Sequence, residues 1–104
     1  MQDIRQRLAA LPPLCSQEPD DPTVYLKFVS DVPTRSWYVA EGSRKSADFV
    51  FYGYEMTPFP NRTYFRFSDL VRLDAHLDAT FQPVRWSVLR RGMRGERQVS
   101  AAVA

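Results

Sequence analysis

The chain is poor in the residues that build covalent or metal-linked scaffolds. It has one cysteine, Cys15, and one histidine, His76, among its 104 residues. A single cysteine excludes an intrachain disulfide, so a reducing, cytoplasmic setting is expected. One cysteine and one histidine cannot form a closed structural zinc site unaided, and we expect no metal and no cofactor.

Long apolar runs and sequence signatures of catalysis are also missing. No stretch approaches the roughly 20 apolar residues of a membrane-spanning helix, and the N-terminal segment lacks the apolar core of a signal peptide. We therefore expect no membrane association. The sequence contains no phosphate-binding loop, dinucleotide-binding glycine pattern or catalytic-triad pattern. An enzyme is the least supported class of function.

Four side chains could carry acid–base or nucleophilic chemistry, and each has a simpler interpretation. His76 lies between two aspartates on a predicted helix, where residues two positions apart point away from each other. Cys15 lies among prolines and acidic residues, which do not favour the nucleophilic thiolate. Glu41 and Glu55 fall at the ends of neighbouring predicted strands, with core parity, and fit solvated strand ends better than a carboxylate pair. We predict a protein that is not an enzyme.

Charge is nearly balanced overall but uneven along the chain. The net charge is +2, and only two of the 14 basic residues are lysine. Residues 18–21 read EPDD, whereas five arginines and one acid lie between residues 85 and 97. Arginine makes bidentate contacts with phosphate and carboxylate groups, so the C-terminal part is a candidate for contacts with anions.

Proline and hydrophobic spacing divide the chain. Ile4, Leu8 and Leu11 have helical spacing, and the two prolines that follow end this helix. We expect an N-terminal helix and a proline- and acid-rich connector in residues 1–22, followed by a single α+β domain in residues 23–91. Residues 92–104 are predicted to be a flexible tail.

Five segments have the composition of strands. They are residues 23–30, 36–41, 48–55, 63–67 and 81–89, with residues 42–47 as a hairpin loop. Ser68 is the predicted N-cap of a helix that begins at Asp69 and carries the leucines 70, 73 and 77 on one side. The sequence predicts an α+β fold: a mainly antiparallel, twisted sheet of about five strands with an N-terminal helix and a helix after strand four.

The aromatic residues separate by type when the strands are read with a period of two residues. One face carries Val24, Leu26, Phe28, Trp37, Val39, Phe49, Phe51, Phe65 and Phe67. The other face carries all five tyrosines with Lys27 and Arg66. This pattern is typical of a sheet with one dry face and one polar face. The tyrosine face is either partly covered by a terminal segment or available for binding. Gly53, inside a strand, indicates a bulge or a close aromatic contact above it.

Three short motifs resemble those of a known family. They are SWYVAEG (residues 36–42), FVFYGYE (residues 49–55) and YFRFSDL (residues 64–70). They resemble the W-Y-x-x-E, F-x-G-Y and Y-F-x-x-x-[D/E]-L motifs of small, single-domain proteins of bacteria, plasmids and phages, a domain of unknown function. The family usually has an acidic residue before the Y-F pair, where this chain has Asn61, Arg62 and Thr63. The resemblance covers roughly residues 24–89, which is most of the chain. It implies a mobile genetic element, often near anti-restriction and DNA-maintenance genes, and no catalytic residues.

Two binding functions follow from these observations. We favour a non-enzymatic binding protein of a mobile genetic element that acts on a host protein complex, of the anti-defence, anti-restriction or anti-CRISPR type. The alternative is a nucleic-acid-binding accessory protein that uses a tyrosine and arginine face. A small enzyme of unknown reaction ranks third. The candidate binding surface comprises Tyr25, Lys27, Tyr38, Arg44, Lys45, Tyr52, Tyr54, Tyr64, Arg66, Arg90 and Arg91.

Overall fold

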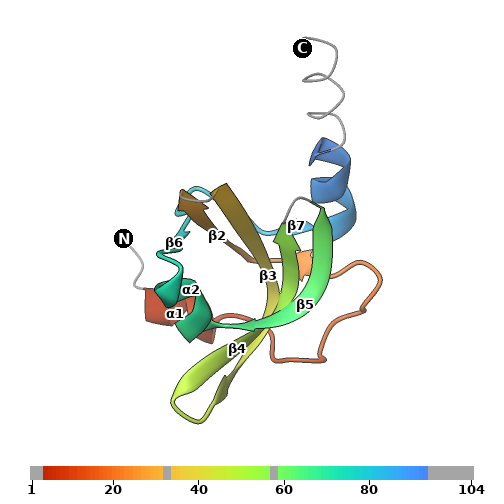
Figure 1. Cartoon of the computed structure of the whole chain (residues 1–104). Coiled ribbons are helices and arrows are strands. Elements are labelled where there is room, and N and C mark those ends of the chain that lie inside the picture. Colours follow the sequence, from red (N-terminus) through yellow and green to blue (C-terminus); the bar gives the residue numbers. More distant parts are fainter. Residues whose placement is uncertain (1–3, 32–33, 57–58, 94–104) are drawn as a thin grey trace.

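The computed structural model describes residues 4–31, 34–56 and 59–93, and its elements are labelled in Figure 1. In chain order they are α1 (Ile4–Ala9), β1 (Thr23–Val24), β2 (Leu26–Asp31), β3 (Thr34–Lys45), β4 (Asp48–Met56), β5 (Pro60–Arg66), α2 (Phe67–Arg72), β6 (His76–Leu77) and β7 (Val84–Arg85). Residues 86–93 are helical. The α+β prediction is confirmed.

The main sheet is antiparallel and has the strand order β5-β4-β3-β2-β6. β1 and β7 pair separately as a second, two-stranded sheet. Strands β3 and β4 form a long hairpin that projects from the rest of the molecule (Figure 1). The pairing continues to Lys45 and Asp48, so the turn is shorter than the predicted loop of residues 42–47.

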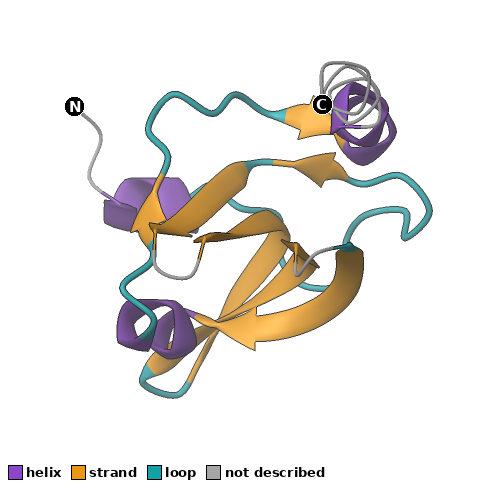
Figure 2. Ribbon diagram, turned by 45° about the horizontal axis from the view of Figure 1, so that its top comes forward, coloured by secondary structure: helices purple, strands orange, loops and turns teal. Residues whose placement is uncertain are grey.

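The C-terminal third of the domain differs from the prediction. Only Val84 and Arg85 of the expected strand 81–89 are extended, and helical structure follows directly (Figure 2). The fifth strand of the main sheet is instead β6, which pairs with Phe28 and Val29 of β2. The residues of β6 were predicted to form the last turn of a helix that reaches Leu77, but they form a strand. Helix α2 starts at Phe67, before the predicted N-cap Ser68, and ends at Arg72.

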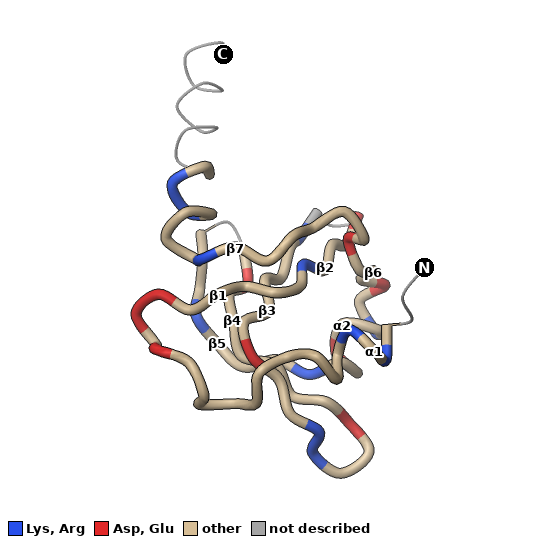
Figure 3. Tube along the Cα trace, turned by 180° about the vertical axis from the view of Figure 1, so that it is seen from behind, with Lys and Arg blue, Asp and Glu red and all other residues tan. Residues whose placement is uncertain are grey.

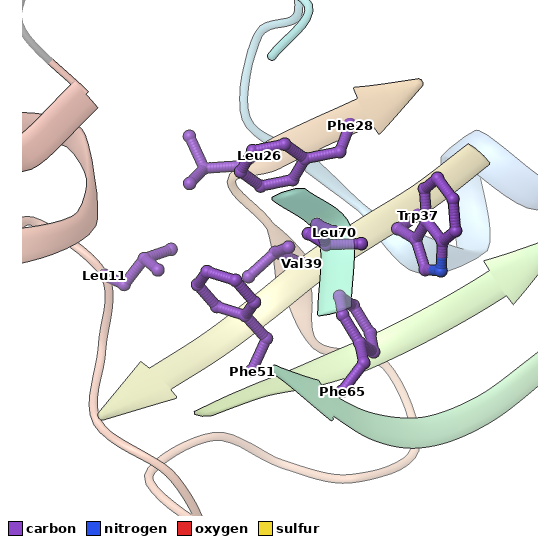
Figure 4. Packing of buried hydrophobic residues seen from close by; sticks show 8 residues of the cluster. All are labelled: Leu11, Leu26, Phe28, Trp37, Val39, Phe51, Phe65 and Leu70. Carbon is purple, nitrogen blue, oxygen red and sulfur yellow. The ribbon is translucent and has the colours of Figure 1, made fainter. Parts of the chain in front are cut away.

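The predicted core face is largely confirmed. A first buried cluster fills one side of the sheet and takes in residues from the connector, the four long strands and α2 (Figure 4). It consists of Leu11, Leu26, Phe28, Trp37, Val39, Phe51, Phe65 and Leu70. Phe49 and Phe67 pack against it while remaining partly exposed. Val24 is the exception: the strand breaks at Tyr25, so Val24 joins a second cluster and Tyr25 packs against the first.

A bulge lies opposite Gly53, with its extra residue in β3 rather than in β4, and the atoms close to Gly53 are backbone atoms rather than an aromatic ring. Val39 pairs with Gly53 and Glu41 pairs with Tyr52, so Ala40 is an extra residue in β3. A side chain at Gly53 would not fit, because a Cβ atom there would lie 1.9 Å from the carbonyl oxygen of Tyr38. The bulge reverses the alternation of β3 beyond Ala40 and moves Glu41 to the tyrosine side of the sheet.

Candidate functional site

Two of the five tyrosines predicted to lie on a binding face are buried. Tyr38 and Tyr54 are 6% and 5% exposed and form the second cluster with Val24 and Trp86. The indole of Trp86 stacks on the ring of Tyr54, with centroids 3.7 Å apart and planes at 6°. Tyr38 and Tyr54 are therefore corrected from surface to core positions.

The covering element is the helical segment 86–93, whose side chains at Trp86, Leu89 and Met93 reach the second cluster. Asp21 caps the start of this segment, because its carboxylate accepts hydrogen bonds from the Ser87 backbone N–H and hydroxyl, both at 2.8 Å. These bonds hold the pKa of Asp21 below its usual value. The acidic connector thus helps to dock the C-terminal helical segment.

Glu41 also binds the connector. It is 3% exposed, and its carboxylate accepts hydrogen bonds from the backbone N–H groups of Cys15, at 2.8 Å, and Gln17, at 2.7 Å. Glu55 lies elsewhere, where it accepts hydrogen bonds from the Trp37 indole at 2.8 Å and from Arg35 at 3.2 Å. The prediction that both glutamates are solvated strand ends with core parity is wrong for Glu41, which the bulge turns to the other face.

The exposed remainder of the tyrosine face lies on β5 and its neighbour β4. Arg62, Tyr64 and Arg66 alternate along β5 and therefore point to the same side of the sheet. Tyr64 is 57% exposed, and its ring lies 5.0 Å from the ring of its cross-strand partner Tyr52. The neighbouring Cys15 thiol raises the pKa of Tyr64, which stays a neutral phenol.

A groove of about 620 Å³ continues this row toward the tip of the β3–β4 hairpin. Lys45 and Arg66 line it, together with the apolar side chains of Val50 and Val71. Asp48 also lines the groove, but its carboxylate accepts hydrogen bonds from Ser68 and from the Phe49 backbone, which lower its pKa. We call Lys45, Tyr52, Arg62, Tyr64 and Arg66 the β5 surface.

The other predicted surface residues do not join the β5 surface. Arg44 pairs with Phe49, on the opposite face of the hairpin from Lys45. Lys27 lies over the ring of Tyr38, with its Nζ atom 5.4 Å from the ring centroid. Arg90 and Arg91 are exposed on the C-terminal helical segment.

Arg62 was missed by the sequence prediction because the fourth strand was started at Thr63. The strand begins three residues earlier, at Pro60. A longer strand would have shown the alternation Arg62, Tyr64, Arg66. Arg62 is oriented by the connector, since its Nη1 donates a hydrogen bond to the Pro19 carbonyl at 3.0 Å.

Comparison of the chain with protein-family models, with curated proteins and with solved structures gives no match. The resemblance of the three aromatic motifs to a phage and plasmid family stays a prediction. Among residues 4–31, 34–56 and 59–93, no group of three or more histidine, cysteine or acidic side chains could hold a metal ion. No helix in the same ranges is both long and apolar enough to cross a membrane.

Proposed function

We propose that the chain is a non-enzymatic binding protein whose β5 surface takes single-stranded nucleic acid. One observation carries this proposal: the exposed ring of Tyr64, backed by Tyr52, lies between two arginines of the same strand. Aromatic rings beside cationic side chains on an open sheet are the usual means of binding single strands.

A single strand fits this surface better than a duplex. A tyrosine ring can stack only on a base whose face is accessible, and the bases of a duplex are stacked on each other. The ring pair of Tyr52 and Tyr64 offers one such platform, and Arg62 and Arg66 flank it at the spacing of alternate strand residues. The guanidinium groups can then contact the phosphates on either side of a stacked base.

Asp48 is ionised, because hydrogen bonds lower its pKa, and it offsets part of the charge of Arg66. Asp48 is hydrogen bonded to Ser68 and Phe49, and Glu41 is buried under the connector. Acidic residues of the connector lie beside β5 near Arg62 (Figure 3). Lys45 and Arg66 line the hairpin groove with one carboxylate, Asp48, so this end of the β5 surface keeps a net positive charge.

The mobile-element setting and a host protein partner remain hypotheses from the sequence. Tyrosine and arginine are also frequent in the centres of protein interfaces. The burial of Tyr38 and Tyr54 reduces the exposed aromatic area that such an interface would use and leaves a row that is richer in charge. This favours nucleic acid as the partner.

Fluorescence anisotropy with labelled single-stranded DNA and RNA of roughly 12 nucleotides, a length within the range that single-strand-binding domains cover, tests the proposal. Tyr64→Ala is expected to weaken binding by about 1–3 kcal/mol, the usual contribution of one stacked base. Tyr64→Phe retains the ring and should bind like the wild type. Val88→Ala, at a position that is 50% exposed on the C-terminal helical segment, is the control.

Absence of oligonucleotide binding would contradict the proposal. A pull-down from host lysate with and without nuclease then identifies the alternative. Partners that survive nuclease treatment and depend on Tyr64 would assign the β5 surface to protein recognition.

A further inference from the structure

A small pocket of about 260 Å³ opens beside the stacked pair of Trp86 and Tyr54. Its walls come from four parts of the chain that are distant in sequence: the connector, β4, β5 and the C-terminal helical segment. The lining residues are Asp20, Tyr54, Pro60, Arg62, Trp86 and Arg90. Arg62 belongs both to this pocket and to the β5 surface, whereas Arg66 lines the hairpin groove. The pocket and the groove therefore lie at opposite ends of the β5 surface.

Two guanidinium groups from different elements line this pocket. Arg62 comes from β5 and is held by the Pro19 carbonyl, whereas Arg90 comes from the helical segment. Within the part of the chain that the structure describes, neither forms an ion pair with a carboxylate. Both remain able to donate hydrogen bonds to an anion, and arginine forks suit the oxygen atoms of a phosphate group.

Tyr54 also lines the pocket. Burial raises the pKa of Tyr54 to about 12, and the positive charges of Arg62 and Arg90 act in the opposite direction. The phenol is therefore protonated at neutral pH.

We propose that this pocket binds a phosphate monoester, as found on a nucleotide or at the end of a nucleic-acid strand. Arg62 and Arg90 contact the phosphate oxygens, the Tyr54 hydroxyl donates a hydrogen bond, and the edge of Trp86 borders the sugar and base. Asp20 is the one carboxylate in the lining, so two positive charges oppose one negative charge. The proposal rests on the proposed function only in naming a strand end as one source of the phosphate.

Calorimetric titration of the full chain with adenosine 5′-monophosphate and with adenosine tests the pocket directly. The monophosphate is expected to bind at least about tenfold more tightly, because charge-assisted hydrogen bonds form only with the phosphate. Arg90→Gln should remove most of that difference. Arg91→Gln, at the next exposed position of the same segment and outside the pocket, should preserve it.

A gain of affinity provides a second test that damage to the fold cannot imitate. Asp20→Asn removes the carboxylate that repels the phosphate and should tighten monophosphate binding about twofold to fivefold, as expected for an exposed charge pair. Glu18→Gln removes the same charge from the connector outside the pocket and should have little effect. Equal binding of adenosine and its monophosphate, or equal losses in Arg90→Gln and Arg91→Gln, would overturn the proposal.

Oligonucleotides with and without a 5′-phosphate separate the two sources of the group. Tighter binding of the phosphorylated strand, lost in Arg90→Gln, assigns the pocket to strand ends, whereas a monophosphate effect alone assigns it to free nucleotides. Loss of monophosphate binding with oligonucleotide binding intact contradicts the pocket only. Loss of oligonucleotide binding with monophosphate binding intact contradicts the proposed function only.

Discussion

The indole of Trp86 lies flat on the ring of Tyr54, with 3.7 Å between the ring centroids. This contact joins the C-terminal helical segment to β4, an interior strand of the main sheet, and covers part of the tyrosine face, for which the sequence left a covered and an open state as alternatives. The same contact forms one wall of the pocket that Arg62 and Arg90 share. The second cluster therefore contributes both to stability and to the shape of the candidate site.

Trp86→Ala should destabilise the protein by about 3–5 kcal/mol, the usual cost of deleting a buried large aromatic side chain. That is a large share of the roughly 5–15 kcal/mol that stabilises a typical domain. Urea unfolding monitored by circular dichroism measures the change. Val88→Ala, two residues further along and half exposed, should change stability by less than about 0.5 kcal/mol. Equal stabilities of Trp86→Ala and the wild type would show that the segment does not pack as described.

Gly53→Ala tests the bulge between β3 and β4. The added methyl group would overlap the Tyr38 carbonyl, so backbone atoms must move, and we expect a loss of about 1–3 kcal/mol or more, as for other overpacked sites. Gly92→Ala is the opposite control, because a Cβ atom there meets no described atom within 4 Å and the residue is helical. It should stabilise by up to about 1 kcal/mol. Thermal unfolding of the two variants should move in opposite directions.

Asp21 should make stability depend on pH in acid. Hydrogen bonds from the Ser87 backbone and hydroxyl lower its pKa in the folded protein below the ordinary 3.8. Its contribution is therefore fully present above that value and is lost as the pH falls through the lower, folded pKa. When the pH is lowered from about 4 to about 2, the free energy of unfolding of Asp21→Asn and of Ser87→Ala should fall less than that of the wild type. Acid unfolding curves that are parallel for all three proteins would contradict the capping role.

The alternation of side chains allowed the first core cluster to be predicted. Leu26 and Phe28, Trp37 and Val39, and Phe49 and Phe51 are each two residues apart, which is the period of a strand. Gly53 indicated an irregularity in its strand without showing that the extra residue lies in the partner strand. The side to which Glu41 points could not be predicted in this way. One extra residue, Ala40, shifts the alternation, and a bulge has no sequence pattern of its own in β3.

The C-terminal helical segment shows a second limit. Val84, Trp86 and Val88 alternate like a strand, whereas Trp86, Leu89 and Met93 have helical spacing, so the sequence fits both structures. The contact that favours the helix is a capping hydrogen bond that the Ser87 N–H donates to the carboxylate of Asp21, 66 residues away. Local spacing cannot reveal such a partner. Coverage of the tyrosine face by a terminal segment was one alternative from the sequence, but the sequence could not show that Tyr38 and Tyr54 are the residues covered.

The most direct test of the central claim is the salt dependence of single-strand binding. Each lost phosphate contact should make the slope of log K against log salt concentration shallower by about 0.7. In the double variant Lys45→Gln and Arg66→Gln on the β5 surface, we predict that the slope becomes shallower by the sum of two such contributions. The matched pair Arg44→Gln and Arg72→Gln removes the same charge from exposed positions outside that surface and should leave the slope unchanged. Equal slopes for both pairs and the wild type would contradict the assignment of the β5 surface to nucleic acid.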